Sequence, residues 1–521
     1  MEIMLIAAVL LAVAAYLFVM QYNLHMFQLN GYKNGEHMHW LQKNISKQGI
    51  LILVIAVGIL TTFIDAIFLN GIFCLALLLT IWYYRYLKQQ KNKKKMVYTN
   101  RVKRMVITNS IISMLCMVIA FVLGGGKALW MVMGILLAAQ PFMMLLVNTI
   151  NKPVENGINQ HYVNDAKKKL AEVPGLQIIG VTGSYGKTSV KYYLHTLLQS
   201  KYNVLITPES YNTPMGVVRT IREQLKSTHE IFICEMGARH VGDIKEICDI
   251  VHPKHGMITS IGPQHLETFF NMENIQNTKF ELADALPADG MLFLNGDNTY
   301  IQEKSVSYQN KIFYHTTVSD GNGYYAENVK VSQLGTEFDV VTPDGETEHF
   351  QMRLIGGHNV INVVGAIAVA HKLGISLKEL RVPVRMIQPV AHRLQMLEKG
   401  FVTIIDDAYN SNPIGSKAAV ETLAMFEGVR ILVTPGMVEL GKEEEKYNYE
   451  FGTYAAKCCD YVALVGKKHT EPIAKGLRDS GFAEDRLQTF EKLEEALSYA
   501  YSIKENGHKY ILLENDLPDN Y

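Results

Sequence analysis

Hydrophobic positions are distributed unevenly along this chain. Apolar runs with almost no charged residues fall within the first 150 residues, at positions 3–20, 50–69, 72–87, 105–123 and 128–147. A helix that spans a bilayer needs roughly 17–25 such residues. The pattern therefore predicts a transmembrane region over residues 1–150 with about five helices, followed by a cytoplasmic linker over residues 151–174.

Short polar breaks separate two pairs of these apolar runs. Asn70 and Gly71 stand between the second and third runs, and residues 124–127 stand between the fourth and fifth. Such short breaks predict tight helical hairpins. The first run opens with Glu2, lacks a basic region before it and has no small-residue cleavage site, so we interpret it as an anchor and not as a signal peptide.

Basic residues crowd the connection between the third and fourth runs. They are Arg85, Lys88, Lys91, Lys93, Lys94, Lys95, Arg101, Lys103 and Arg104. Short basic loops stay on the cytoplasmic side, so we expect a multi-pass protein of the cell membrane with residues after 148 in the cytoplasm. Residues 21–49 are predicted to lie along the inner membrane surface. Binding of anionic lipid headgroups is the alternative use of the basic run.

From residue 176 onward, short apolar runs alternate with helix-like stretches. Strands are predicted at LQIIGV, NVLIT, IFICEMG, HGMITSIG and GMLFLNGDN, and later at FVTIIDDAY, VRILVTPG, DYVALVG and YILLEN. This alternation is typical of parallel sheets covered by helices. The predicted fold class is α/β: transmembrane helices, a P-loop central domain over residues 175–384 and a Rossmann-like carboxyl-terminal domain over residues 385–521.

Composition gives no support to a nucleic acid partner or to a disulfide framework. Lys and Arg together number 50, as do Asp and Glu, so the net charge of zero gives no reason to expect a nucleic acid partner. The six cysteines include no CxxC pair, and we interpret them as reduced structural thiols.

The stretch IIGVTGSYGKTS combines a strand, a glycine-rich turn and the start of a helix. Gly183 and Gly186 let backbone N–H groups face phosphate oxygens, Lys187 adds a positive charge, and the Thr188 hydroxyl can bind Mg²⁺. Val181 stands where the strict GxxxxGK[ST] pattern has its first glycine. The sequence still predicts that this turn binds a nucleotide triphosphate.

The same stretch resembles the phosphate loop of the Mur ligases, ATP-dependent amide-forming enzymes of peptidoglycan precursor synthesis. Further motifs follow in the family's order: SYNTPMG, EMGARHVGDI, IGPQHLETF, NTKFEL, GGHNVINVVGAIAVA, HRL, DDAYNSNP and GMVELG. Within the family they are most similar to the enzymes that join D-alanyl-D-alanine to a UDP-muramoyl tripeptide. The resemblance implies an ADP-forming acid–amino-acid ligase that acts through an acyl phosphate.

The resemblance also implies a catalytic set, with Lys187, His265, Lys279 and Arg393 as its members. Two Mg²⁺ ions are expected, with Thr188 and Glu235 at the first. His265 resembles a ligand of the second ion, and Lys279 matches a lysine that the family carries as a carbamate. The alternative for Lys279 is an ordinary surface lysine on a helix.

Nucleotide and substrate contacts are likewise implied by the resemblance. ATP is expected to contact Gly183, Ser184, Gly186, Lys187, Thr188, Ser189, His358, Asn359, Arg393, Asp407, Tyr409 and Asn410. Asn212 and Thr213 are expected to touch the substrate, and a structural role in a turn is their alternative. Asn359 could instead cap the helix that follows it.

The chain departs from the family in three places. Membrane segments stand where the uridine-binding domain is expected, the end ILLENDLPDNY replaces a KGSR-like segment, and Pro435 and Gly436 replace Gly-Asp. We therefore expect a membrane-anchored ligase whose partners are ATP, a cell-wall peptide or lipid-linked precursor, an amino acid or dipeptide amine, and membrane lipid. Alternatives are an amide ligase for a polymer resembling poly-γ-glutamate, a P-loop transport ATPase and a catalytically silent scaffold.

Overall fold

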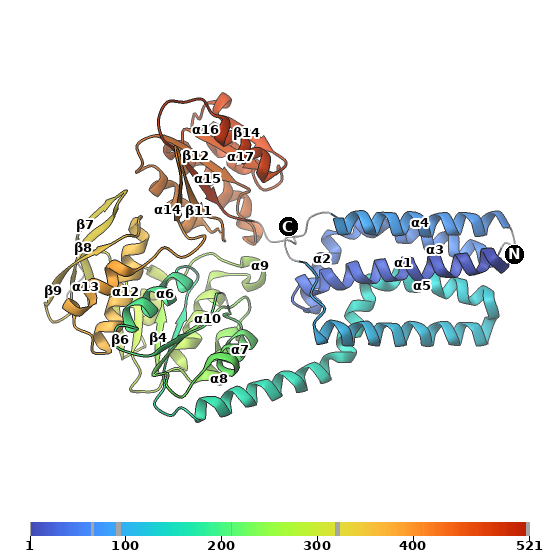
Figure 1. Cartoon of the computed structure of the whole chain (residues 1–521), viewed down its shortest axis with the longest axis horizontal. Coiled ribbons are helices and arrows are strands. Elements are labelled where there is room, and N and C mark those ends of the chain that lie inside the picture. Colours follow the sequence, from blue (N-terminus) through green and yellow to red (C-terminus); the bar gives the residue numbers. More distant parts are fainter. Residues whose placement is uncertain are drawn as a thin grey trace. The chain divides into compact units, whose positions relative to one another are not determined.

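The chain consists of two compact units, and the boundary between them lies between Gln160 and His161. The computed structural model describes residues 2–63, 67–89, 95–209, 211–317, 323–409 and 411–516. Unit 1, up to Gln160, is helical, whereas unit 2, from His161 onward, holds two β-sheets covered by helices (Figure 1). The predicted α/β fold class with apolar amino-terminal helices is confirmed.

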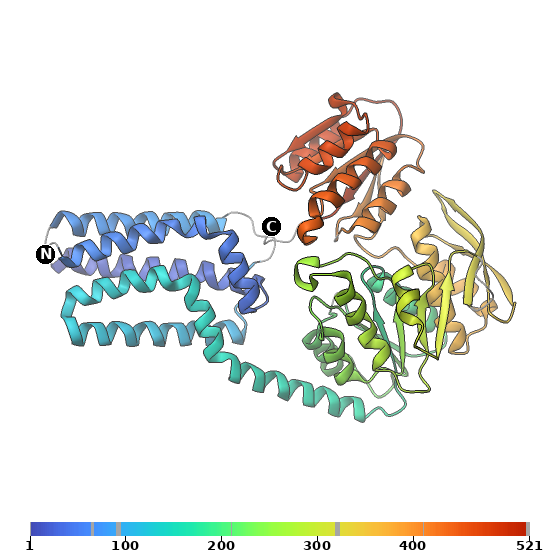
Figure 2. The same ribbon diagram turned by 180° about the vertical axis from the view of Figure 1, so that it is seen from behind.

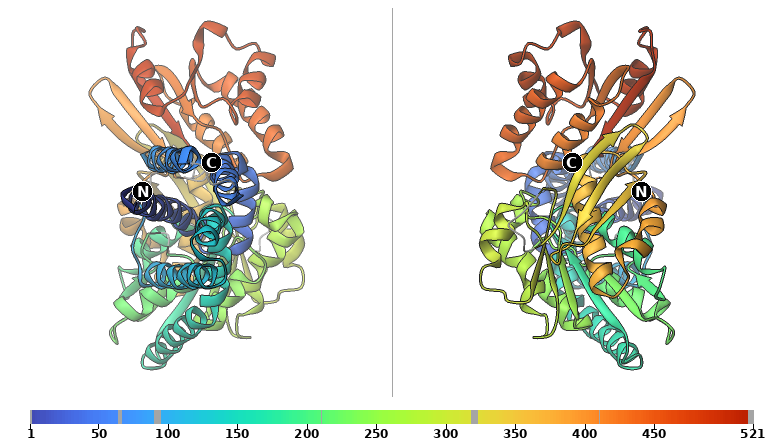
Figure 3. Two further views of the ribbon diagram at one scale, coloured as in Figure 1. Left: turned by 90° about the vertical axis from the view of Figure 1, so that its right-hand side faces the viewer. Right: turned by 90° about the vertical axis from the view of Figure 1, so that its left-hand side faces the viewer.

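Unit 1 consists of long helices that lie side by side, as the end-on view of Figure 3 shows. They are α1 (Glu2–Leu29), α2 (Asn34–Lys43), the 3₁₀ helix η1 (Ile45–Gln48), α3 (Gly49–Phe63), α4 (Ile67–Gln89) and α5 (Asn100–Ala171). Non-helical angles at Gly125 break α5, so the hairpin predicted at residues 124–127 is confirmed. The hairpin predicted at Asn70 and Gly71 is wrong, because both lie inside α4.

Three helical stretches of unit 1 are long and apolar enough to cross a membrane. They are Ala8–Leu29, Asn100–Gly126 and Ala128–Ala171, and the pair Asn34–Lys43 and Ile45–Leu60, bent by 84°, is a fourth candidate. The described residues therefore do not reach the predicted five. Asp65 and part of the basic connection, Lys91, Lys93 and Lys94, lie outside the described residues. The predicted orientation stays a prediction.

Two segments with other expected roles are helical. Residues 21–29 continue α1, so only the later part of segment 21–49 forms separate short helices. Residues 151–171, most of the expected linker over 151–174, are the last part of α5, which continues through both Pro153 and Gly157.

The larger sheet of unit 2 has nine strands in the order β2-β3-β1-β4-β5-β6-β7-β8-β9. The parallel strands are β1 (Gln177–Thr182), β2 (Val204–Ile206), β3 (Ile231–Glu235), β4 (His255–Ile258), β5 (Leu292–Asn295) and β6 (Lys311–His315). An edge ribbon, yellow in Figure 1, adds β7 (Gly323–Ser332), β8 (Gly335–Val341) and β9 (Thr347–Met352), and β8 runs antiparallel to both neighbours. This ribbon was not predicted.

Helices pack on both faces of this sheet. They are α6 (Lys187–Leu198), α7 (Pro214–Gln224), α8 (Asp243–Val251), α9 (Leu266–Phe269), α10 (Met272–Asp284), α11 (Thr299–Ser305), α12 (Gly357–Lys372) and α13 (Leu377–Met386). One buried cluster joins α6 and α12 to the sheet, and another joins α7, α8 and the end of α5 to its opposite face. β1 is therefore enclosed on both faces, and its apolar residues read as a continuous run.

The smaller sheet has the order β10-β11-β15-β12-β13-β14 and is parallel except for β10. Its strands are β10 (Gln395–Lys399), β11 (Val402–Asp407), β12 (Val429–Thr434), β13 (Tyr461–Val465), β14 (Leu487–Phe490) and β15 (Lys509–Glu514). Its helices are α14 (Pro413–Leu423), η2 (Gly441–Glu443), α15 (Glu444–Cys458), α16 (Glu471–Asp479), η3 (Glu484–Arg486) and α17 (Leu493–Ser502), shown from behind in Figure 2.

Candidate active site

The glycine-rich turn joins β1 to α6 at the carboxyl end of the central strand. Gly183 and Gly186 have φ angles of 151° and 80°, where glycine is favoured. The backbone N–H of Ser184 donates to the carbonyl of Ser260 at 2.7 Å, and that of Tyr185 donates to the Ser260 hydroxyl at 2.9 Å. The loop after β4 therefore holds the turn in an open shape at the amino end of α6, where anions bind.

Lys187 folds back over its own turn. Its Nζ donates to the carbonyls of Gly183 at 2.6 Å and Ser184 at 3.1 Å. The pKa of Lys187 is lowered to about 8, chiefly by burial, while the charge of Glu235 opposes this shift and that of Arg393 adds to it. A phosphate is a stronger partner for an ammonium group than a carbonyl is. The side chain is thus placed to exchange these carbonyls for the phosphates of a nucleotide.

Glu235, at the end of β3, lies at the centre of a buried polar cluster. Its Oε1 accepts hydrogen bonds from the Thr188 hydroxyl and the Asn212 amide, both at 3.0 Å. Its Oε2 forms an ion pair with Nζ of Lys191 at 2.9 Å. Burial alone would raise the pKa of Glu235, but Lys191 and Lys187 outweigh it and lower that pKa. The carboxylate is therefore ionised.

Thr188 and Glu235 fit a Mg²⁺ ion, because that metal prefers hydroxyl and carboxylate oxygens and takes its remaining ligands from phosphates and water. Among the described residues, no group of three or more His, Cys, Asp or Glu side chains could hold a metal ion. A Mg²⁺ ion held by these two residues would therefore take its other ligands from phosphate and water. When bound, the ion would neutralise phosphate charge.

His265 follows β4 in a left-handed conformation, with φ of 51°. Its Nδ1 is hydrogen-bonded to the Glu439 carboxylate, which also lies 3.3 Å from Arg239 Nη1. Burial lowers the pKa of His265 despite Glu439. With Nδ1 engaged, only Nε2 is left for a ligand. Glu439 comes from the loop after β12 and was not predicted.

Lys279 lies on α10 and is only 2% exposed. Its amino group forms no hydrogen bond or ion pair with any described residue. Burial, together with the charge of Lys187, lowers the pKa of Lys279 far below its ordinary value. The alternative of an ordinary surface lysine is therefore wrong, and burial disfavours the charged form of the amine.

A cavity of about 320 Å³ opens beside the turn. Of the predicted nucleotide contacts, it is lined by Gly186, Ser189, His358, Asn359, Arg393 and Asp407. Side chains that were not predicted also line it, among them Tyr185, Asn298 and Glu514. Residues that follow strands of both sheets therefore share one pocket large enough for a nucleoside.

The side of the pocket formed by the smaller sheet carries a guanidinium and two carboxyl groups. The Arg393 guanidinium lies 4.5 Å from the centre of the Tyr409 ring. Asp407 and Glu514 are paired residues of β11 and β15, so their side chains adjoin. Burial raises the pKa of Asp407, against the lowering effect of Arg393, and raises that of Glu514 more strongly. The neighbouring charge of Asp407 adds to the shift in Glu514.

Other predicted contact residues have structural roles. The Ser184 hydroxyl donates to the Gly262 carbonyl at 3.0 Å. Thr213 caps α7, and Asn359 donates to the Ile355 carbonyl at 2.8 Å while it lines the pocket. Asn410 lies outside the described residues.

The pattern of motifs has counterparts among known proteins. Residues 181–370 match the sequence model of the Mur ligase middle domain, and residues 392–513 match that of the Mur ligase glutamate ligase domain. A Bacillus subtilis protein named UDP-N-acetylmuramoyl-tripeptide–D-alanyl-D-alanine ligase is 32% identical over 348 residues, which are 66% of this chain and 73% of that protein. The chain belongs to the Mur ligase family. The predicted resemblance is confirmed, and so is the predicted class of ATP-dependent, ADP-forming ligases.

Two further relatives of this Mur ligase are informative. The Escherichia coli protein of the same name is 29% identical over 378 residues, covering 70% of this chain and 83% of its own. The crystal structure of the Thermotoga maritima MurF ligase in complex with ADP aligns with a TM-score of 0.61 and 24% identity, covering 69% of this chain and 80% of that one. At that identity the structural likeness shows the fold alone.

Lys191, Glu439 and Glu514 are among the site residues of this Mur ligase that escaped the sequence-based predictions. Lys191 stands one helical turn after Lys187, and its position in KTSVK was a usable signal because residues four apart share a helix face. Glu439 and Glu514 reach the site only through the packing of the smaller sheet, which the sequence does not display.

Proposed function

We propose that this Mur ligase joins D-alanyl-D-alanine to the peptide of a muramoyl tripeptide, as the names of its relatives describe, and that it does so at a membrane. The observation that supports this most directly is the convergence of Lys187, Thr188 and Glu235 beside a pocket that Arg393 also lines. An anionic nucleotide and an anionic carboxylate can be brought together only where cations offset their repulsion.

The proposed chemistry has two steps. A carboxylate oxygen of the tripeptide attacks the γ-phosphorus of ATP, and ADP leaves with the electron pair of the broken P–O bond. The dipeptide amine then attacks the acyl carbon, inorganic phosphate leaves, and the nitrogen loses a proton to a base or to solvent. Lys187 and Arg393 hold the phosphates from two sides, and Mg²⁺ at Thr188 and Glu235 supplies charge neutralisation.

We further propose that Lys279 carries a carbamate that orients a second Mg²⁺ with His265. A neutral amine is the form that adds CO₂, and burial shifts the unpaired amino group of Lys279 toward that form. The carbamate would add two oxygen atoms and a negative charge near Lys187.

Membrane attachment rests on the outer surface of unit 1. Leu10 on α1, Ile52 on α3, Trp82 on α4 and Leu123 on α5 are 65%, 69%, 66% and 82% exposed. Soluble proteins rarely expose such extensive apolar surface. Lipid covering these faces would also allow a lipid-linked muramoyl peptide to serve as the substrate.

Two other functions are less well supported. A transport ATPase would leave His265 and Lys279 without a role. Lys279 lies near Lys187 of the phosphate turn, and His265 lies near Lys279. A ligase that builds a different polymer uses the same activation chemistry, and only the identity of the product separates it from our proposal.

A product assay tests the ligase proposal. The purified full-length chain is incubated with ATP, Mg²⁺, D-alanyl-D-alanine and either a nucleotide-linked or a lipid-linked muramoyl tripeptide, and products are identified by mass. We expect a product heavier by one dipeptide less one water, together with ADP. Lys187→Ala should lower its formation by about a thousandfold or more. Product formation by Lys187→Ala at the wild-type rate would contradict the assigned role.

Chemical rescue tests the carbamate. Lys279→Ala should lose nearly all activity, because an oxygen ligand is missing, and short carboxylic acids added to the assay should restore part of it by occupying the vacated space. Lys279→Arg, which keeps the positive charge but cannot form a carbamate, serves as the control and should stay inactive with the same additives. Full activity in Lys279→Ala without additives would rule the carbamate out.

A further inference from the structure

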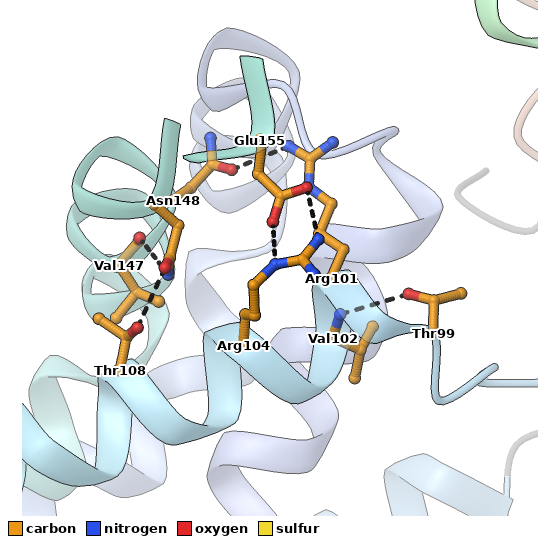
Figure 4. A network of polar contacts seen from close by, with 9 residues as sticks. Thr99, Arg101, Val102, Arg104, Thr108, Val147, Asn148 and Glu155 are labelled. Carbon is orange, nitrogen blue, oxygen red and sulfur yellow. Dashed lines mark hydrogen bonds and ion pairs between the residues drawn. The ribbon is translucent and has the colours of Figure 1, made fainter. Parts of the chain in front are cut away.

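A polar cluster in unit 1 joins the start of α5 to a later stretch of the same helix (Figure 4). Arg104 donates to both carboxylate oxygens of Glu155, from Nε at 2.7 Å and from Nη2 at 2.9 Å. Glu155 is 5% exposed. This bidentate pair engages both oxygens of Glu155 with Arg104, so Arg101 interacts with that carboxylate by charge alone and not by a hydrogen bond.

Arg101 lies one helical turn before Arg104 and makes fewer hydrogen bonds than Arg104 does. Its Nη2 donates to Oδ1 of Asn148 at 3.0 Å, which is its one hydrogen bond to a described residue. The guanidinium lies 4.2 Å from the centre of the Tyr32 ring, and Nε is buried without a partner. A guanidinium has five N–H donors, so most of those of Arg101 are left for a group outside the described chain.

Charge around Arg101 favours an anion as that group. The first turn of α5 contains Arg101, Lys103 and Arg104 and no acidic residue, although a helix amino end carries positive partial charge and favours acids. Between residues 66 and 154 the sequence contains no Asp or Glu. Among the described residues, Glu155 is the carboxylate for which a contact with this cluster is given, and counting it against Arg101, Lys103 and Arg104 leaves an excess of two positive charges.

The surroundings of Arg101 hold it in place. Nδ2 of Asn148 donates to the Tyr32 carbonyl at 3.2 Å and to Oδ1 of Asn34 at 2.9 Å, which fixes the amide that Arg101 contacts. The Thr99 hydroxyl accepts from the N–H of Val102 at 3.3 Å and so caps the helix. The guanidinium is therefore preorganised on a rigid turn, which lowers the entropic cost of binding an anion.

We propose that Arg101, with the first turn of α5, binds the phosphate group of an anionic membrane lipid. The site rests on the proposed membrane attachment, which brings lipid phosphates to this end of the helices, and it is separate from the nucleotide pocket of unit 2. A phosphate supplies several acceptor oxygens to the unused donors of Arg101 and satisfies the positive amino end of α5. Soluble phosphate has the same chemistry, so the test distinguishes the two sources.

Native mass spectrometry of the purified full-length chain measures this binding. The protein is prepared in detergent with equal amounts of phosphatidylglycerol and phosphatidylcholine, and the lipids retained on the folded chain are counted. We expect one phosphatidylglycerol to be retained in preference to phosphatidylcholine. Arg101→Gln should lower its retention about tenfold or more, because charge-assisted hydrogen bonds are lost.

Arg85→Gln is the matched control. Arg85 is an exposed residue of α4 within the same basic stretch, so its loss removes one charge without touching the cluster. Retention in this variant should stay within about twofold of wild type. Equal losses in the two variants would mean general attraction between a basic surface and anionic lipid, and would overturn the proposal.

Two further measurements close the remaining alternatives. Inorganic phosphate at millimolar concentration should not displace the lipid, and displacement would assign the site to soluble phosphate instead. Arg101→Lys, which keeps the charge but loses the fork of donors, should fold as judged by circular dichroism and retain less lipid than wild type. Wild-type retention in a folded Arg101→Gln chain would refute the site. None of these results depends on ligase activity, so the proposed reaction can fail or succeed separately.

Discussion

At the scale of single residues, the site depends on side chains whose ordinary pKa values or hydrogen bonds are changed by their neighbours. Burial lowers the pKa of Lys279 and raises that of Glu514, and Glu439 engages one nitrogen of His265. Each state follows from a neighbour distant in the sequence. The chemistry of the site is therefore set by packing as much as by residue type.

Glu439 offers a direct test of this dependence. Its carboxylate fixes the ring of His265 so that Nε2 faces outward with a free electron pair, as carboxylates behind ligating histidines do. Glu439→Gln should lower kcat by about 10- to 100-fold while the Kd of ADP changes less than about twofold. Steady-state kinetics and calorimetry measure the two quantities.

Glu443→Gln is the control for that substitution, since Glu443 is exposed on the same loop region and contacts only the surface residue Lys446 at 3.6 Å. It should retain wild-type kcat. An unchanged kcat in Glu439→Gln at saturating Mg²⁺ would show that His265 needs no such support.

The sequence identified some of these residues and not others for a physical reason. Thr188 follows Lys187 directly, and Glu235 ends an apolar strand, so local pattern and residue type were enough to assign both to a magnesium site. Glu439 lies 174 positions from its partner His265. Pairings across such separations depend on how two sheets pack, which no local pattern encodes.

At the scale of elements, the β1–α6 turn is held by its neighbours as firmly as by its own hydrogen bonds. A Cβ atom on Gly183 would lie 2.1 Å from Oγ1 of Thr259 and 3.0 Å from the backbone N of Ser260. Both residues also bond to the turn. The loop after β4 therefore packs against the turn with no room for a side chain.

Gly183→Ala should consequently destabilise unit 2. The added methyl group meets backbone as well as a side chain, and φ of 151° is unfavourable for alanine, so we expect a loss of about 2 kcal/mol or more in the free energy of unfolding, together with weaker ADP binding. Urea unfolding of a chain that begins at His161 measures the first effect.

Gly175→Ala provides the comparison, because a Cβ there meets nothing within 4 Å. Its free energy of unfolding should change by less than about 0.5 kcal/mol. If the two variants were equally stable, the close packing around Gly183 would be unimportant to the fold.

Elements with strong, unbroken patterns were predictable, and those without them were not. The buried strands β1, β3 and β12 appear as apolar runs because parallel strands covered on both faces have no polar side. The edge strands β7 to β9 alternate buried and exposed residues among turn signals, so they were missed. The end of α1 was misplaced because polar residues of its last turns pack inside unit 1.

At the scale of the whole molecule, the division into units does not coincide with the end of a secondary-structure element. α5 continues to Ala171, but its last residues pack in unit 2, where Ala166 is fully buried and Asp165 pairs with Arg222 at 2.5 Å. The ligase portion therefore includes a piece of helix that the sequence had indicated as linker.

A chain that begins at His161 should fold alone and remain soluble, because unit 2 is compact by itself and large enough to bury its own cores. It should retain ligase activity with a nucleotide-linked tripeptide within about tenfold of the full chain, while losing the lipid-linked substrate. Membrane fractionation and the product assay measure both properties.

A chain that begins at Gly175 is the informative comparison. It lacks the helical turns that contain the buried residue Ala166. We therefore expect a lower melting temperature and a greater tendency to aggregate. Equal stability of the two chains would show that the end of α5 is dispensable. Recovery of the His161 chain in the membrane fraction would instead show that unit 1 is not what binds the membrane.

The resting position of Lys187 has a consequence for selectivity. Its amino group already donates hydrogen bonds to two carbonyls of its own turn, so an incoming anion must replace these two bonds. Chloride and other weakly coordinating cellular ions carry a single charge and few directed acceptor atoms. A polyphosphate also accepts hydrogen bonds from the amide groups of the turn. We therefore expect the turn in this resting state to bind small anions less readily than a polyphosphate.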